Sequence, residues 1–330
     1  MCAYQVVKHV ECKTAGDFID AISPFGPHFR RFPPEHAWIF RGHGDDNYKL
    51  VPSALREKNI NNLHQLARSD SLIANKPDLN ISQWLAENRI ICEFFSSADN
   101  SGRDLPEDSQ ILRSKLFETF RKLQSLSKGI IDGTTTGIPA DLFWPPLEVL
   151  SLVAMAQHHG LLTRLLDWSQ SSYKAAYFAA IDALNLKEKN EPSKQMAVWA
   201  IQPGNIFKKS FLCKEEGSYC KIYPVTVPHA ANPNLHAQDG LFTICGRNNE
   251  SVNSKVDRRP MDIIVNSEDY THSDTDAQIF YHFTVPSNEA ECVLWYLNKH
   301  RVNASTLFPN FDGSARAVRE QLLQRAPHNP

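Results

Sequence analysis

Hydrophobic positions repeat with a helical period through the middle of the chain. Near its centre they stand at i, i+3, i+4, i+7, i+8 and i+11, at Tyr173, Ala176, Tyr177, Ala180, Ile181 and Leu184. This spacing predicts an amphipathic helix, and Ser171 is placed to act as its N-cap. Similar apolar patterns predict helices over residues 81–95, 111–126, 145–157 and 288–300.

Runs of aromatic and β-branched residues predict strands toward both ends of the chain. The early candidates are the alternating run 3–10 and Trp38–Phe40, and the later ones are 196–201, 221–227, 241–245, 261–265 and 279–285. The polar segment 96–110 is expected to be a loop. This order predicts an α+β fold in which a helical block (about 53–185) packs on a sheet. We expect a mixed or antiparallel sheet formed by the early strand and the C-terminal strands.

The 330 residues suffice for one large domain or two smaller ones. We interpret residues 35–320 as a single domain with a helical insertion at about 53–145. Residues 1–34 are expected to be an N-terminal extension packed on that domain, and residues 321–330 a C-terminal tail.

Composition narrows the classes of function. The net charge of −2 argues against broad electrostatic binding of nucleic acid, although a local basic groove remains compatible with it. No apolar run reaches the roughly 20 residues needed to cross a bilayer, and the N-terminus lacks the pattern of a secretion signal. The seven cysteines are scattered without a Cys-x-x-Cys pair. We therefore expect a cytoplasmic protein with reduced thiols, no metal site and no membrane partner.

Titratable residues concentrate in the stretch 157–169, between two of the predicted helices. Neighbouring residues on a helix point about 100° apart, so His158 and His159 are not expected to ligate one metal together. One of them is a candidate general base or orienting group, and the other a cap of the helix that Gly160 ends. Within the same stretch, Arg164 and Asp167 form either an internal salt-bridge network or an anion site in which Asp167 orients a histidine.

A second group of candidates follows the early strand. Arg41 stands before Gly42 and His43, where a strand ends and a ligand can approach the backbone. Two interpretations of Arg41 remain open. It either clamps a phosphate or forms an ion pair with a carboxylate such as Asp167. His43 is interpreted as a ligand contact or as a solvent-facing residue.

Hydroxyl and carboxyl groups elsewhere complete the candidate site. Ser169 and Ser171 are interpreted as helix caps or as the lining of a ligand pocket. Gln238 and Asp239 precede a predicted strand, and Asp239 is either a catalytic carboxylate or a turn residue. The sequence contains no Walker loop, Gly-x-Gly-x-x-Gly, His-Glu-x-x-His or Gly-x-Ser-x-Gly motif, which argues against several common enzyme classes.

The motifs resemble those of the FRG domain family. Phe40-Arg41-Gly42 matches its name-giving triplet, and Leu50–Ser53 with Arg56 resembles its continuation. Residues 156–179 resemble the family's central block, which is specific to it. Residues 232–243 and 306–313 resemble two further blocks of the family. Leu162 and Ser172 replace expected prolines, and Asn234 replaces an arginine. The resemblance implies a bacterial cytoplasmic protein, often linked to phage defence or mobile elements.

The chain is also similar, more distantly, to ADP-ribosyltransferases of the Arg-Ser-Glu type. Arg41 corresponds to the first element and Ser169-Gln170-Ser171 to the second, while Gln238-Asp239 stands where a glutamate is expected. This analogy implies an NAD-consuming transferase or glycohydrolase of a toxin-like kind. Its substrate would be a small nucleotide ligand, NAD, and its macromolecular acceptor, protein or nucleic acid, stays open.

Three hypotheses for the function follow. In the first, Arg41 holds a pyrophosphate, Ser169 and Ser171 line a ribose pocket, and Asp239 or Asp167 stabilises an oxocarbenium-like state. In the second, the protein is a non-catalytic module that senses a nucleotide, nucleic acid or protein in phage defence. In the third, it is a nucleic-acid-processing enzyme, which requires a basic groove.

Overall fold

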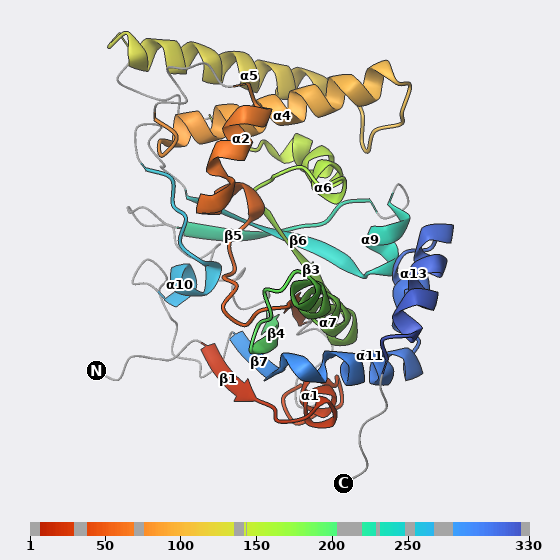
Figure 1. Cartoon of the computed structure of the whole chain (residues 1–330). Helices are drawn as coiled ribbons and strands as arrows, with labels where there is room; N and C mark the ends of the chain where they lie inside the picture. Colours follow the sequence, from red (N-terminus) through yellow and green to blue (C-terminus); the bar gives the residue numbers. More distant parts are fainter. Residues whose placement is uncertain are drawn as a thin grey trace, which may run out of the picture.

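The chain folds around one mixed sheet (Figure 1). A computed structural model describes residues 7–29, 38–68, 76–134, 142, 144–202, 220–228, 232–247, 255–266 and 280–324. The strands, in the spatial order β1–β7–β4–β2–β3–β6–β5, are β1 (Val7–Glu11), β2 (Ile39–His43), β3 (Leu165–Ser169), β4 (Gln195–Ile201), β5 (Cys220–Val225), β6 (Gly240–Arg247) and β7 (Phe280–Pro286). β1 pairs parallel with β7, and the other neighbours pair antiparallel.

Helices cover both halves of this sheet, and the predicted α+β fold is confirmed. The α-helices are α1 (Ala15–Ile22), α2 (Ile60–Leu66), α4 (Asn80–Asn100), α5 (Gln110–Ile131), α6 (Leu150–His158), α7 (Ser172–Glu188), α9 (Pro233–Ala237), α10 (Met261–Asn266), α11 (Ala290–Lys299), α12 (Ala304–Leu307) and α13 (Phe311–Gln321). The 3₁₀ turns are η1 (Ser53–Leu55), η2 (Glu57–Asn59), η3 (Leu147–Val149) and η4 (Ser287–Glu289). As predicted, Ser171 caps α7 by accepting a hydrogen bond from the Lys174 amide.

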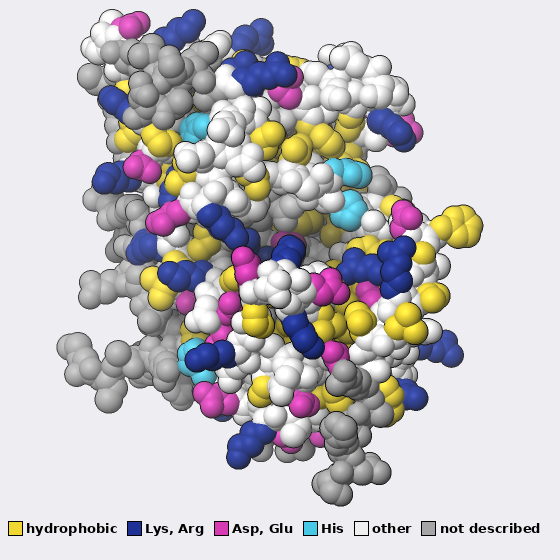
Figure 2. All heavy atoms as spheres, viewed as in Figure 1, with side chains coloured by type: hydrophobic (Ala, Val, Ile, Leu, Met, Phe, Trp, Pro, Cys, Tyr) yellow, Lys and Arg dark blue, Asp and Glu magenta, His cyan; other side chains and the backbone are white. Residues whose placement is uncertain are grey.

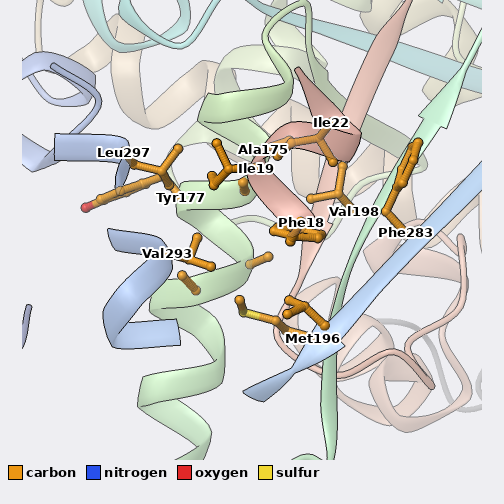
Figure 3. Close-up of a cluster of buried hydrophobic side chains, with 14 of the residues drawn as sticks. Phe18, Ile19, Ile22, Ala175, Tyr177, Met196, Val198, Phe283, Val293 and Leu297 are labelled. Carbon is orange, nitrogen blue, oxygen red and sulfur yellow. The ribbon is translucent and has the colours of Figure 1, made fainter. Parts of the chain in front are cut away.

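Two separate hydrophobic cores pack on the two halves of the sheet. In the first, α1, α7 and α11 cover β4 and β7, with side chains such as Phe18, Tyr177, Val198 and Phe283 fully buried (Figure 3). In the second, α4, α5 and α6 cover β3 and β6. Figure 1 shows α4 and α5 at the top of the molecule and α7 with α11 at the bottom. A third hydrophobic cluster packs on the middle of the sheet, where it joins Ile39 of β2 with Leu166 and Trp168 of β3.

The structure corrects three local predictions. Residues 261–265 form helix α10 rather than a strand, because Met261, Ile264 and Val265 are buried at helical spacing directly after Pro260. Helix α4 continues to Asn100, into the segment 96–110 that was expected to be a loop. The helical block 53–185 is interrupted by β3, whose five residues were not predicted as a strand. The first four residues of the predicted strand 3–10 lie outside the described residues.

Candidate functional site

The sheet opens between β2 and β3. These strands share one register pair, Phe40 with Ser169, whereas β2 pairs with β4 and β3 with β6 over five residues each. Beyond that pair the side chain of Arg41 spans the gap, and its Nη1 donates a 2.7 Å hydrogen bond to the Asp167 carbonyl. A side chain thus replaces the backbone hydrogen bonds that would have closed the sheet.

A cavity of about 500 Å³, here called the central cleft, lies at this opening. This volume falls within the range typical of small-molecule sites. Its charged or titratable lining residues, among those described, are Arg41, Arg56, His158 and Asp167. Aromatic side chains, including Phe178 and Phe308, supply apolar walls. In Figure 2, basic and acidic side chains gather across the middle of the viewed face, between the helices above and α7 below.

Arg41 forms an ion pair with Asp167, as the structural interpretation predicted. Nη1 lies 2.6 Å from Oδ1 of Asp167, and Nε donates to Nε2 of His43 at 2.9 Å. The Arg41 side chain is 13% exposed. Nη2 has no hydrogen-bond partner in the described part of the chain. The same arginine therefore ties β2 to β3 and keeps donors available at the edge of the cleft.

Asp167 presents its carboxylate to the central cleft. Its side chain is 60% exposed, although the walls of the cleft surround it. Gln157 donates to it from Nε2 at 3.2 Å, while Oε1 of Gln157 accepts a hydrogen bond from Thr163. Burial by the walls alone would raise the pKa of Asp167, but the charge and hydrogen bond of Arg41 outweigh this effect and lower it. Asp167 is therefore ionised at neutral pH.

A second guanidinium, that of Arg56, stands near Arg41. Its Nε donates to the Val51 carbonyl at 2.9 Å, and Ser53, at the start of η1, is bonded to the backbone of Thr163 in the central stretch. Arg56 is partly buried, and burial, followed by the charge of Arg41, lowers its pKa. Among the described residues no carboxylate lies within ion-pair distance of it. The lining of the cleft therefore holds two arginines and one carboxylate, which leaves a net positive charge there.

The two adjacent histidines take different positions, as the helical geometry predicted. His158 lines the central cleft, and its Nε2 lies 3.1 Å from Nδ2 of Asn234, the residue that departs from the expected arginine. Burial, followed by the charge of His159, lowers the pKa of His158, so its ring is neutral at pH 7. His159 is exposed at the C-cap of α6, and Gly160 follows in the left-handed conformation (φ +85°).

The serines frame the cleft through backbone contacts. Ser169 is buried, donates from Oγ to the Gln238 carbonyl at 2.7 Å and accepts a hydrogen bond from the Ser171 amide. Ser171 caps α7 and is not among the residues that line the cleft. Gln238 does line it, and Nε2 of Gln238 donates to the Leu307 carbonyl at 3.3 Å. These contacts connect the start of α7 to the turn before β6.

Three further candidates, Asp239, Arg164 and His43, do not line the central cleft. Asp239 adopts a turn conformation (φ +46°), and its carboxylate pairs with Lys174 at 2.6 Å. Arg164 is buried in an ion pair with Glu87, also at 2.6 Å, so the predicted internal network exists but its carboxylate is Glu87. His43 is buried, and burial, followed by the charges of Arg41 and Arg56, lowers its pKa well below the usual value. His43 lies in a neighbouring cavity rather than in the cleft.

Comparison with known families identifies the part of the chain that holds Arg41, Arg56 and the stretch 157–169. Residues 36–188 match the family model described as the FRG domain. The match to the FRG domain covers β2, the stretch 157–169 and α7. No curated protein and no solved structure matched the chain in the same comparisons. The likeness to ADP-ribosyltransferases stays a hypothesis.

The FRG domain triplet has a clear structural basis. Phe40 enters the core under α7, and Arg41 spans the opening of the sheet. Gly42 lies against α7 so closely that an added Cβ would stand 1.9 Å from the Ala175 carbonyl oxygen. Only glycine permits this approach without a shift of strand or helix. Phe40 therefore packs in the core, Arg41 bridges β2 and β3, and Gly42 leaves room for α7.

Sequence reasoning overlooked Arg56 as a site residue of the FRG domain. It was quoted only as part of the family continuation after Leu50–Ser53. The signal that could have found it was the same resemblance, because Arg56 is the charged residue of that continuation. Among the described residues, no group of three or more histidine, cysteine, aspartate or glutamate side chains is arranged to hold a metal. In the same part of the chain, no helix is both long and apolar enough to cross a bilayer.

Proposed function

We propose that the FRG domain binds a phosphate-bearing nucleotide in the central cleft, with NAD as the first candidate, and acts on its N-glycosidic bond. The observation that carries this proposal is the pair Arg41 and Arg56 beside a single carboxylate, at the opening of the sheet. A partly buried guanidinium without a carboxylate partner favours an anionic ligand. Phosphate suits it because a guanidinium fork can donate two parallel hydrogen bonds.

The apolar walls fit the remainder of such a ligand. Phe178 and Phe308 line the cleft with their ring centroids 6.3 Å apart and their planes nearly perpendicular. Aromatic faces of this kind pack well against a nicotinamide or purine ring. Gln157, His158 and Gln238 add hydrogen-bonding groups suited to ribose hydroxyls. The cleft therefore combines phosphate, sugar and ring contacts in one cavity.

In the proposed reaction, the bond between C1′ of the ribose and the nicotinamide nitrogen breaks. The bonding electrons return to the pyridinium ring, so neutral nicotinamide leaves and no acid is needed. Asp167 stabilises the oxocarbenium-like ribose that remains. Water, or an acceptor nucleophile, then forms the new bond to C1′ and releases its proton to solvent. His158 orients the substrate, because the hydrogen bond from Asn234 to Nε2 places the ring proton on Nδ1.

This assignment moves the carboxylate role from Asp239 to Asp167. Asp239 is held by Lys174 outside the lining of the cleft, whereas Asp167 is exposed within it. Ser171 lies outside the lining of the cleft, and Ser169 lines it with an Oγ that already bonds the Gln238 carbonyl and the Ser171 amide. The predicted roles of both serines therefore become supporting ones.

A second candidate function is a ligand-sensing module without turnover. The observation in its favour is that Asp167 already pairs with Arg41 and accepts from Gln157, and no other carboxylate lines the described part of the cleft. A carboxylate that is already paired contributes less to stabilising a new positive charge. Both candidates predict nucleotide binding, and only the first predicts release of nicotinamide.

The decisive experiment is calorimetric titration of NAD into the full chain, combined with chromatographic detection of nicotinamide. We expect Arg56→Gln to weaken NAD binding by about ten- to a hundredfold, as loss of a charge-assisted hydrogen bond does. Asp167→Asn is expected to retain binding and to lower turnover by about a hundredfold or more. Lys115→Gln, an exposed change on α5, is the matched control.

The possible results separate the two candidates. Failure of the wild type to bind millimolar NAD would reject NAD as the ligand. Binding that depends on Arg56 without any release of nicotinamide would favour the sensing module. Circular dichroism of each variant distinguishes a lost contact from a lost fold.

We place this activity in a bacterial defence or toxin-like system acting in the cytoplasm, as the FRG domain resemblance implies. An NAD-consuming enzyme would then arrest growth when expressed. We expect that arrest to disappear in Asp167→Asn cells that contain normal amounts of folded protein. Equal arrest by the wild type and this variant would contradict an enzymatic cause.

A further inference from the structure

A second cavity adjoins the central cleft behind its two arginines. It has a volume of about 580 Å³ and is here called the basic pocket. Arg41, Gly42 and Arg56 line both cavities. The two arginines therefore stand at the boundary, where their guanidinium groups are placed to contact a ligand from either side. Neither the family match nor the proposed chemistry at Asp167 assigns a role to this pocket.

The basic pocket carries an excess of positive charge. Besides the shared arginines, its lining includes Lys49, Lys58 and Arg258. Its carboxylates are Glu57 and Asp182, and the latter already accepts a hydrogen bond from the Gly44 amide at 3.0 Å. His43 adds no charge, because its ring is neutral. With Arg41 paired to Asp167, four cations face two carboxylates in this lining.

Arg258 is fixed in position by neutral partners. It donates from Nη1 to the Leu55 carbonyl at 3.1 Å and from Nη2 to Oε1 of Gln83 at 3.2 Å. No ion pair to Arg258 occurs within the described ranges. Lys49 and Lys58 are exposed at the rim, also without an ion pair in that part of the chain. A preorganised guanidinium and two unpaired ammonium groups around a cavity favour a multiply charged anion over a single carboxylate.

We propose that the basic pocket is a second phosphate subsite, which binds a phosphorylated nucleoside group while the reactive end of the ligand lies against Asp167. The inference rests on the proposed function and extends it. Arg41 and Arg56 would contact the phosphates that join the two ends, and Lys49, Lys58 and Arg258 the outer group. The phosphate chemistry has two sources. It belongs to the far half of one dinucleotide or to a separate nucleotide bound beside the first.

The test compares three probes with the full chain: NAD, nicotinamide mononucleotide and AMP. The variant is the double substitution Lys49→Gln with Lys58→Gln, which changes two exposed side chains, and Lys115→Gln is the control. We expect the double variant to weaken binding of NAD and of AMP by about fivefold, as loss of two exposed charges does. Binding of nicotinamide mononucleotide is expected to stay within about twofold, because that probe lies in the central cleft.

The outcomes distinguish one dinucleotide from a separate nucleotide as the source of the phosphate. They also separate a failure of the subsite from a failure of the proposed function. Displacement of both AMP and nicotinamide mononucleotide by NAD supports a single dinucleotide across both cavities. Undiminished binding of AMP to NAD-saturated protein supports a separate nucleotide in the basic pocket. NAD and AMP binding that is unchanged in the double variant overturns the subsite, even if NAD is turned over. If the wild type binds neither NAD nor nicotinamide mononucleotide, the proposed function fails instead, and AMP binding that depends on the lysines then supports the subsite alone.

Discussion

Two ion pairs lie close together along the chain, one just before β3 and one at its middle residue, and their surroundings differ sharply. Arg41 pairs with Asp167, and Arg164 pairs with Glu87, each with a nitrogen–oxygen distance of 2.6 Å. In the first pair the carboxylate side chain is 60% exposed, whereas in the second the two side chains are 6% and 3% exposed. The comparison shows that pairing distance alone does not distinguish a ligand site from a structural tie.

The difference lies in the other partners of each carboxylate. Glu87 also accepts hydrogen bonds from Gln83 at 2.7 Å and from Trp144 at 2.9 Å, inside the helical block. This fully bonded network leaves no capacity for a ligand. Asp167 instead has Gln157 and Arg41 on one side and the open cleft on the other. The Arg164–Glu87 pair, here called the sealed pair, holds α4 to the start of β3. The Arg41–Asp167 pair, here called the open pair, lines the proposed site.

The largest effect is expected from breaking the sealed pair. Glu87→Gln removes the charge that compensates Arg164 and leaves a buried cation without an anionic partner. We expect the free energy of unfolding to fall by about 3–5 kcal/mol. Urea denaturation of the variant and of Asp167→Asn measures the contrast. A loss for Glu87→Gln no larger than that for Asp167→Asn would contradict the distinction between the two pairs.

A smaller effect is expected from crowding the strand that carries Arg41. Gly42→Ala places a Cβ against the Ala175 carbonyl oxygen, so β2 or α7 has to shift. We expect a destabilisation of about 1–3 kcal/mol, as overpacking causes. Because Arg41 moves with its strand, NAD binding should weaken as well. Unchanged stability and binding in this variant would show that the close approach of strand and helix is not required.

The smallest effect on stability is expected from removing the charge of Asp167 in the open pair. This effect is measured through the dependence of the free energy of unfolding on pH. Asp167 is largely exposed, so Asp167→Asn should cost about 1 kcal/mol or less at pH 7. A lowered folded-state pKa means that this stabilisation is fully present above the ordinary carboxyl pKa of about 3.9 and is lost as the pH falls through the folded value. The difference between wild type and variant should therefore be constant from neutral to mildly acidic pH and vanish in strong acid.

Urea unfolding at a series of pH values from neutral to strongly acidic provides that measurement, with Lys115→Gln as the control. A wild-type advantage that grows as the pH falls would contradict the sign of the effect. It would mean that the protonated carboxyl, rather than the carboxylate, is the stabilising form of Asp167.

Periodicity and turn chemistry were sufficient to predict most of the elements. The stripe from Tyr173 to Leu184 predicted α7, and Ser171 caps that helix as expected. The same signals failed at Met261–Asn266 and at Leu165–Ser169. Short apolar runs suit a buried helix turn or a strand equally well, and long-range pairing decides between them. β3 forms because β6 offers a five-residue partner that is distant in the sequence.

The sequence by itself determined most of the candidate residues of the site, in the Phe40-Arg41-Gly42 triplet and in the polar stretch 157–169 between two helices. A pair between Arg41 and Asp167 was one of the two interpretations that the sequence left open for Arg41. Only the tertiary structure decided which groups meet at the cleft. It turned Asp239 toward Lys174, enclosed Arg164 with Glu87 and brought Arg56 beside Arg41. Such contacts depend on where strands diverge and which core encloses each side chain, and neither property is local to the chain.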